Sequence, residues 1–404
     1  MKYIIKSRAI PGLVLAVFLV LILGAGWARA ELSVQCPLDT DGIDTDGDGI
    51  VDNDVLCIHL AAGDGFLNMA DGKLLYMFGF SEATGETVDM VMMNHNLAQE
   101  FPAPTLVFKE GQKVYLTLSN VGMQMRPDLF DPHSVHFHGF PNAAPIFDGM
   151  PNSTLTIKMG FSQPYFYQIV EPGTFIYHCH VEATEHMEMG MIGQLYVLPI
   201  QNNLAEGTNL NGFIHHTGYK YAYNDGDGST HYDVEYPLQL GSMDSNFHEE
   251  HLKVQPLPFA KLKGDYFMIN GRGYPETVIT APLANTFNGN ESQKLDSLIT
   301  AQQGQKVLLR LSNLAVTEYF TITVQGIPMR VVGKGANLLR GPTGLDLSYL
   351  TNSVTLGGGE TYDVILDTAL VSPGTYYLYA TNLYYLSNNR EDNGGMMTEV
   401  VITP

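Results

Sequence analysis

The chain is short of positive charge. Its 404 residues include 21 Lys and Arg against 42 Asp and Glu, a formal net charge of -21 at pH 7. An acidic surface repels a phosphate backbone, so the composition argues against nucleic-acid binding. Long apolar runs are also scarce. No stretch after residue 30 is long enough to span a bilayer, and we expect no membrane span beyond the N-terminal segment.

The long apolar run that does occur lies at the N-terminus. Residues 1–30 start with Lys2, Lys6 and Arg8, continue through the apolar stretch 13–23 and end in the small-x-small sequence 28–30. This order is typical of a secretory signal peptide that is cleaved from the mature protein. No cysteine follows the cleavage site, which argues against lipid attachment there. We therefore expect a secreted protein, with the periplasm as its compartment.

Cysteine is rare, with three in the chain. Cys36 and Cys57 flank a short segment, and in an oxidising compartment they are expected to form a disulfide. The alternative is a pair of free thiols. Cys179 lies far from this pair, between two histidines.

An Asp-rich segment, DTDGIDTDGDGIVDND, fills residues 39–54. Its spacing matches an oxygen-ligand calcium loop, with ligands expected from Asp44, Asp46, Asp48, the Ile50 carbonyl and Asp52. Val55 stands where an EF-hand has Glu, and no helix pattern flanks the loop. It resembles instead the calcium loops of thrombospondin type 3 and dockerin repeats; the alternative is a solvated acidic linker. We predict a small stapled, non-catalytic extension over residues 31–68.

The most informative stretch is PGTFIYHCHVEATEHMEMGMIGQLYV at 172–197. A strand that leads into His178, Cys179 and His180 points alternate side chains to opposite faces. Cys179 can then close with His186 and Met191 on one soft metal. One thiolate, imidazoles and a weak thioether are the ligands of a blue, type 1 copper site.

The second imidazole of such a site is expected from DPHSVHFHGFP at 131–141. In a strand, His136 and His138 share one face and His133 lies on the other. We predict one copper site from His133, Cys179, His186 and Met191, and behind it a cluster of four imidazoles from His136, His138, His178 and His180. The alternative, a Cys that packs as a small hydrophobe among structural histidines, is disfavoured by so many histidines at ligand spacing.

These motifs resemble the multicopper oxidase family and its relative copper nitrite reductase, over nearly all of the chain from about residue 70. The resemblance implies type 1 copper at Cys179 and type 2/3 copper at the four histidines. Two features depart from the family pattern. His186 follows Cys179 by seven residues where most members have five, and Met189 competes with Met191 as axial ligand. We favour Met191 because the gap of five from His186 then matches the family.

The chain also contains an internal repeat. EGQKVYLTLSN at 110–120 recurs as QGQKVLLRLSN at 303–313, and PGTFIYHCH at 172–180 aligns with PGTYYLYAT at 373–381. We predict an all-β protein of two cupredoxin-like Greek-key β-sandwich domains behind the N-terminal extension. The predicted boundaries are a copper-binding domain at 69–200, a linker at 201–230 and a second cupredoxin-like domain at 231–404.

The second repeat lacks the metal ligands. His136 and His138 align with Thr323 and Gln325, and no histidine follows His251. A trinuclear cluster of the family uses eight imidazoles from two domains, so this chain offers half of them at matching positions. Other histidines, interpreted mainly as solvated surface features, are alternative sources of the rest: His215, His216, His248 and His251.

The resemblance implies a copper oxidoreductase with Cys179, His178 and His180 as catalytic residues. Electrons would enter at the type 1 copper and pass to the clustered copper, with oxygen as acceptor and a homo-oligomer completing the cluster. The alternative is an exported copper-binding or electron-transfer protein with an incomplete cluster. A structural role with vestigial copper is a third hypothesis. The electron donor stays open among a small reduced molecule, a metal ion and a redox protein.

Overall fold

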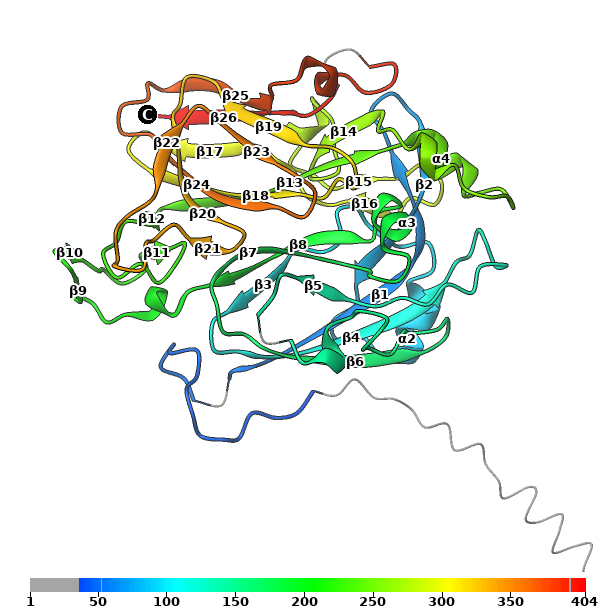
Figure 1. The fold of residues 1–404 in the computed structure, drawn as a ribbon, viewed down its shortest axis with the longest axis horizontal. Helices are drawn as coiled ribbons and strands as arrows, with labels where there is room; N and C mark the ends of the chain where they lie inside the picture. The colour runs from blue at the N-terminus through cyan, green and yellow to red at the C-terminus, as the bar shows by residue number, and fades with distance from the viewer. Residues whose placement is uncertain (1–35, 52, 142, 392–393) are drawn as a thin grey trace, which may run out of the picture. The chain divides into compact units, whose positions relative to one another are not determined.

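The computed structural model describes residues 36–404 except 52, 142 and 392–393, so the predicted signal peptide lies outside the described residues. Within these ranges the two predicted β-sandwiches are confirmed, and Figure 1 shows the first in blue to green and the second in green to red. One sheet of the first sandwich has the order β2-β1-β4-β6, and the other has the order β3-β8-β7-β5. These strands are β1 (Val55–Asn68), β2 (Leu74–Glu82), β3 (Leu106–Lys109), β4 (Lys113–Gly122), β5 (His136–His138), β6 (Ser162–Gln168), β7 (Gly173–His178) and β8 (Ile192–Leu198).

The second sandwich repeats this plan. Its sheets have the orders β14-β13-β18-β24-β20-β21, with β22 paired to β20, and β17-β26-β25-β19-β23. Their strands are β13 (Val234–Met243), β14 (Tyr266–Ile269), β17 (Ile299–Gln302), β18 (Lys306–Asn313), β19 (Phe320–Val324), β20 (Met329–Lys334), β21 (Asn337–Leu338), β22 (Tyr349–Thr351), β23 (Ser353–Leu356), β24 (Thr361–Asp367), β25 (Gly374–Ala380) and β26 (Met397–Thr403). A small hairpin, β15 (Leu283–Ala284) and β16 (Glu291–Gln293), precedes β17.

The repeat extends to strand pairing. β1 runs parallel to β4 as β13 does to β18, and β3 runs parallel to β8 as β17 does to β26. Each sandwich buries its own apolar cluster, around Leu116 and Phe137 in the first and around Leu309 and Ile322 in the second. Burial of apolar side chains between two sheets is the main force that holds each sandwich together.

Among the described residues, helices are few and short. They are α2 (Val88–Asn94), α3 (Ala183–Glu188) and α4 (Ser245–Glu250), and single 3₁₀ turns occur at Pro145–Phe147, Ile200–Asn203, Phe259–Lys261, Glu276–Val278 and Leu383–Leu386. The Asp244 carboxylate caps α4 by accepting hydrogen bonds from the N–H groups of Asn246 and Phe247. α4 lies beside β2 and α3 (Figure 1). Nowhere in the described ranges is a helix both long and apolar enough to cross a bilayer.

The predicted N-terminal extension, residues 31–68, ends too late in the sequence. Val55–Asn68 is strand β1, which pairs with both β2 and β4 and is buried over most of its length. Because both faces of this strand are covered, its sequence lacks the alternation that marks a half-exposed strand.

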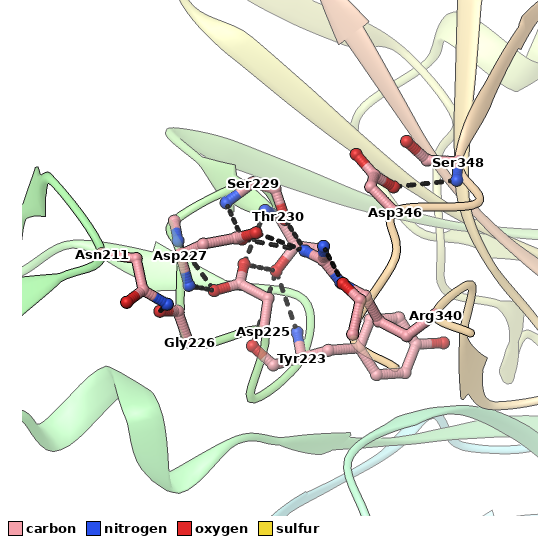
Figure 2. A network of polar contacts seen from close by, with 12 residues as sticks. Asn211, Tyr223, Asp225, Gly226, Asp227, Ser229, Thr230, Arg340, Asp346 and Ser348 are labelled. Carbon is pink, nitrogen blue, oxygen red and sulfur yellow. Dashed lines mark hydrogen bonds and ion pairs between the residues drawn. The ribbon is translucent and has the colours of Figure 1, made fainter. Parts of the chain in front are cut away.

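The predicted linker at 201–230 contains one short hairpin, β9 (Asn209–Leu210) with β10 (Phe213–Ile214), and the first strand of another, β11 (Lys220–Tyr221). The partner of β11 is β12 (His231–Tyr232), which lies just beyond the predicted boundary. Figure 2 shows the polar contacts of the Asp-Gly turn in this linker. The Asp225 carboxylate accepts hydrogen bonds from the N–H and the hydroxyl of Thr230, both at 2.6 Å. Arg340, which follows β21, donates a hydrogen bond to the Asp227 carboxylate at 2.7 Å. This contact holds the Asp-Gly turn against the second sandwich.

Polar contacts also join the two sandwiches. Thr174 in β7 donates its hydroxyl to the Asp363 carboxylate in β24 at 2.6 Å. Asp363 lies 3.5 Å from Arg310, whose side chain is completely buried. Because β7 ends at His178, these contacts hold the second sandwich against the strand that leads into the histidine-cysteine motif.

Candidate metal centres

Cys179 follows the last residue of β7 and is completely buried. Its N–H donates to the Met191 carbonyl at 3.0 Å, which fixes the motif against the start of β8. Its Sγ lies 3.2 Å from Nδ1 of His186 and 3.8 Å from Nδ1 of His133. These three residues form a group whose potential ligand atoms all lie within 4.8 Å of one another.

Two different elements position the imidazoles. His133 exchanges backbone hydrogen bonds with Ile157, at 2.9 and 2.8 Å, and so is held by an isolated β-bridge. His186 lies in α3, a six-residue helix inside the long gap between Cys179 and Met191. The N–H of Met191 donates to the His186 carbonyl at 2.8 Å, and both Met189 and Met191 are completely buried. The choice of Met191 as the axial ligand therefore stays a prediction.

The donor set of this group fits a soft metal cation. Burial raises the pKa of the Cys179 thiol to about 12, lowers the pKa of His186 to about 4 and holds the pKa of His133 well below its usual range. The imidazoles are therefore neutral and keep a lone pair for a metal, whereas the thiolate requires a bound cation to persist there. A buried thiolate with two neutral imidazoles suits copper.

The four remaining motif histidines lie on the other side of Cys179. In the β5–β7 pair, His136 is directly opposite His178. His136, His138 and His178 bring potential ligand atoms within 4.8 Å of one another, and Nδ1 of His138 is 3.4 Å from Nε2 of His178. The His180 ring centroid lies 5.0 Å from that of His136 and 5.5 Å from that of His178. The structure thus brings all four imidazoles together.

Hydrogen bonds orient two of these rings. Nδ1 of His178 is 2.9 Å from the Cys179 carbonyl, which leaves Nε2 directed at His138. Nδ1 of His136 is 2.5 Å from the Asp148 carbonyl and 3.5 Å from its carboxylate. Burial lowers the pKa of His178 to about 3, and the pKa values of His136 and His138 are also lowered, mainly by burial. Neutral imidazoles of this kind are metal ligands.

Asp148, whose carboxylate lies beside His136, was not among the predicted site residues. Asp148 is the C-cap of the 3₁₀ turn Pro145–Phe147 and lies twelve residues after His136 in the sequence. Gly149 follows with φ of +80°, and a Cβ there would lie 2.0 Å from the Val135 carbonyl oxygen. The close approach of this loop to β5 therefore requires glycine. The Asp-Gly pair is the signal that was available in the sequence.

The second sandwich borders the histidine cluster without adding a histidine to it. A cavity of about 190 Å³ is lined by His138 together with Lys334, Gly359 and Glu360. In the repeat, Thr323 lies opposite Tyr379 as His136 lies opposite His178. The positions that would carry ligands in a metal-binding second domain are therefore occupied by other residues.

The interpretation of His248 and His251 as solvated surface residues is wrong. Both are buried. The ring of His248 is fixed between two carbonyl groups, those of Tyr76 and Glu188. His251 places its Nε2 3.7 Å from the Glu185 carboxylate. Of the other pair, His216 is exposed whereas His215 is buried against Tyr221.

A second acidic group beside the cysteine site was also missed. Asp131, Glu185 and His186 bring potential ligand atoms within 4.8 Å of one another. Burial, together with the neighbouring carboxylates of Glu182 and Asp131, raises the pKa of Glu185 to about 7. Asp131 is the first residue of the motif at 131–141, and Glu185 stands directly before His186 in the motif at 172–197. The two motifs come together only in the folded chain, so the sequence alone does not show that these carboxylates are close.

The N-terminal predictions have separate outcomes. The disulfide between Cys36 and Cys57 is confirmed. Asp44, Asp46 and Asp48 converge within 4.8 Å, but the Lys109 ammonium lies 3.1 Å from Asp46 and 3.0 Å from Asp48. The N–H of Ile50 donates to Asp48, and Asp52 lies outside the described residues. Calcium binding by this loop stays a prediction.

Comparisons with known proteins agree on one family. Residues 81–211 and 247–402 match family models described as multicopper oxidase, and the two matches together span more than half of the chain. Multicopper oxidase MCE of Talaromyces pinophilus is 31% identical over 132 residues, which cover 32% of this chain and 20% of that protein. Copper resistance protein A of Escherichia coli is 23% identical, with 66% of this chain and 41% of that protein covered. The chain thus spans less than half the length of either relative.

The fold has close counterparts among solved structures. A blue copper oxidase from Nitrosomonas europaea superposes with a TM-score of 0.60 and 23% sequence identity, with 86% of each chain covered. At this identity the similarity is one of fold, and it extends over both sandwiches.

Proposed function

The chain belongs to the multicopper oxidase family, and we propose from its own residues that it is a copper-dependent oxidoreductase. In this proposal, type 1 copper is held by His133, Cys179, His186 and Met191, and further copper is held by His136, His138, His178 and His180. Bound copper supplies one-electron redox chemistry at the first site and the reduction of oxygen at the second.

The observation that carries this proposal is the place of Cys179 between the two histidine groups. Its Sγ is 3.2 Å from Nδ1 of His186, while its chain neighbours His178 and His180 belong to the four-histidine cluster. An electron that passes from the first histidine group to the second therefore crosses the Cys179 side chain, the backbone to a neighbouring residue and one imidazole. The burial of Cys179 excludes water from this path, and the hydrogen bond between His178 and the Cys179 carbonyl holds the ring in place.

Oxygen chemistry of the family type needs ligands beyond the four histidines of one chain. We therefore also propose that a second copy of this chain supplies the missing metal ligands of the cluster. The support is an exposed apolar rim around the loop that contacts His136: Ile146 is 55% exposed and Leu155 is 65% exposed. Apolar side chains mark a protein–protein contact where they form one contiguous exposed patch, and we propose that these do. Activity is then expected to fall when the protein is diluted to monomers.

The alternative function is an electron-transfer or copper-binding protein whose cluster holds one or two ions without oxygen chemistry. The observation that favours it is that Thr323 and Tyr379, and not histidines, occupy the equivalent pair of positions in the second sandwich. The electron donor is proposed from three classes, namely a small reduced molecule, a metal ion and a redox protein.

The test is the copper content of the purified mature protein, measured with optical and EPR spectra at a known oligomeric state. Three or more copper ions per chain, including an EPR-silent pair, support the oxidase. One or two ions, all EPR-active, with no oxygen consumed for any reductant, support the electron-transfer alternative. Absence of an intense blue band at full copper loading contradicts both.

We also propose that the protein works outside the cytoplasm, most simply in the periplasm. The support is the Cys36–Cys57 disulfide, because such bonds persist in oxidising compartments. Fractionation of the source cells, with the disulfide checked by thiol labelling, tests this proposal.

A further inference from the structure

A cavity of about 560 Å³ opens on the second sandwich, on the outer face of the sheet that contains β20 and β24. Met329 and Val331 of β20 belong to the core of this sandwich, so Arg330 between them points outward. Arg330 lies directly opposite Ile365 in β24 and Leu350 in β22. Residues directly opposite each other in an antiparallel pair share a face, and all three of these residues line the cavity.

The lining of the cavity is mainly apolar. Ile365 is 3% exposed and belongs to a buried cluster with Tyr223 and Tyr232, which flank the Asp-Gly turn. Leu350 and Leu370, in contrast, are 71% and 98% exposed. The cavity therefore extends from a covered apolar wall to an exposed apolar rim, and a bound molecule that covers the two leucines removes apolar surface from water. The other aliphatic residues of the lining are Pro328, Ala369 and Val371.

Arg330 supplies a fixed cationic group to the cavity. Its Nε and Nη2 donate to the Ser348 hydroxyl at 3.0 and 2.8 Å, and Nη2 also donates to the Asp346 carboxylate at 2.9 Å. Its Nη1 donates to the Ser229 carbonyl at 2.9 Å. Because Nη1 carries two hydrogens and makes this one bond among the described residues, a second N–H is left for a ligand.

Lys306 supplies a second cationic group. It is the first residue of β18 and lies directly opposite Asp367 at the end of β24, on the same face as Ile365. Within the ranges that the structure describes, its ammonium forms no ion pair and no hydrogen bond. The Asp367 carboxylate instead accepts a hydrogen bond from the N–H of Ala369 at 3.0 Å. The charge of Lys306 is therefore left for a molecule in the cavity.

The charges around the cavity differ in balance from those of the whole chain. Two cationic side chains, Lys306 and Arg330, line it against one acidic side chain, Asp367. In the whole chain, 42 acidic residues stand against 21 Lys and Arg. An ionised acid is repelled by most of such a surface and is attracted here.

We propose that this cavity is a binding site for an organic acid, a molecule with an apolar body and one negatively charged head. The body lies against Ile365, Leu350 and Leu370, and the head accepts charge-assisted hydrogen bonds from the Lys306 ammonium and from Nη1 of Arg330. The volume is in the range of cavities that bind small molecules, which are mainly apolar with a few polar groups that orient the ligand. This inference goes beyond the copper chemistry and does not depend on it.

The experiment is isothermal titration calorimetry of the copper-loaded mature protein with two probes, octanoate and 2-naphthoate. Lys306→Gln keeps most of the side-chain length and removes the charge, and it is expected to weaken acid binding at least tenfold. Lys261→Gln is the matched control, because Lys261 is exposed and lies outside the cavity. Binding of the neutral octanamide is expected to change less than twofold in Lys306→Gln. An equal loss for the amide and the acid overturns the role of charge.

The apolar rim is tested by Leu350→Asp, which places a carboxylate beside the body of the ligand and is expected to weaken binding of the acid at least tenfold. Leu383→Asp is its control, since Leu383 is 75% exposed and lies outside the cavity. Thermal unfolding checks that each variant is folded.

Binding of octanoate alone assigns the site to aliphatic acids, and binding of 2-naphthoate alone assigns it to aromatic acids. Failure of both acids to bind, or equal binding by the wild type and both site variants, overturns the proposal. Cys179→Ser removes the blue copper site and is expected to leave acid binding unchanged, so the outcomes for copper and for this cavity are independent.

Discussion

His136 lies directly opposite His178 in the β5–β7 pair, and Thr323 lies opposite Tyr379 in the corresponding β19–β25 pair. These pairings match the sequence alignment of the two repeats position by position. The sandwich itself therefore does not depend on metal ligands at these positions. It keeps its strand register with histidines in one copy and with a threonine and a tyrosine in the other.

The first prediction concerns Cys179. A change of Cys179 to Ser removes the thiolate, so the intense blue band is expected to disappear from the copper-loaded protein. The side chain is completely buried, and a hydroxyl in its place needs a partner, for which the Val181 carbonyl at 3.7 Å from Sγ is available after a small shift. We expect a stability loss of about 1–3 kcal/mol and a retained fold, measured by urea unfolding. A blue band that survives this change contradicts the assignment.

The second prediction separates Met191 from Met189. A weak thioether ligand stabilises Cu(II) over Cu(I), so Met191→Leu is expected to raise the reduction potential of the blue site. Met189→Leu is the matched control, since both methionines are completely buried and the replacement nearly conserves volume. We expect it to cost less than about 1.5 kcal/mol and to leave the potential unchanged. The opposite pattern, with the shift in Met189→Leu, makes Met189 the axial ligand.

The metal motifs were predictable because their chemistry is local. Side chains in a strand alternate between its two faces, so His136 and His138 lie on the same face. This prediction requires no information about contacts with distant parts of the chain. The position of His251 was not predictable in this way. Helical spacing indicates that His248 and His251 share a face, but packing of α4 against Phe78 decides what that face meets. Strand β1 was missed for a related reason, because its parallel partner β4 begins almost sixty residues later along the chain.

The third prediction concerns Glu188, which is buried and accepts a hydrogen bond from the N–H of Asp244 at 2.8 Å. Burial raises its pKa from 4.5 to about 8. A raised pKa means that the neutral acid is favoured in the folded state, so its stabilising contribution is complete below about pH 4.5 and is lost as pH rises through 8. Glu188→Gln cannot ionise. Thermal unfolding of both copper-free proteins at pH 5, 6.5 and 8 is expected to show a stability difference that grows with pH in favour of the variant, and a constant difference contradicts the assignment.

The fourth prediction concerns Lys109 and the calcium loop. Its ammonium bonds to Asp46 and Asp48, so calcium must displace it before it can use both carboxylates. Lys109→Gln leaves the completely buried Asp46 carboxylate without a cation, and we expect a loss of about 1–3 kcal/mol in EDTA. Calcium is expected to restore this loss in the variant and to change the unfolding temperature of the wild type much less. Lys113→Gln is the matched control, because Lys113 pairs with the more exposed Asp41. If calcium stabilises the wild type as strongly as the Lys109 variant, the ammonium does not compete with the ion, and the loop is a calcium site as the Asp spacing predicts.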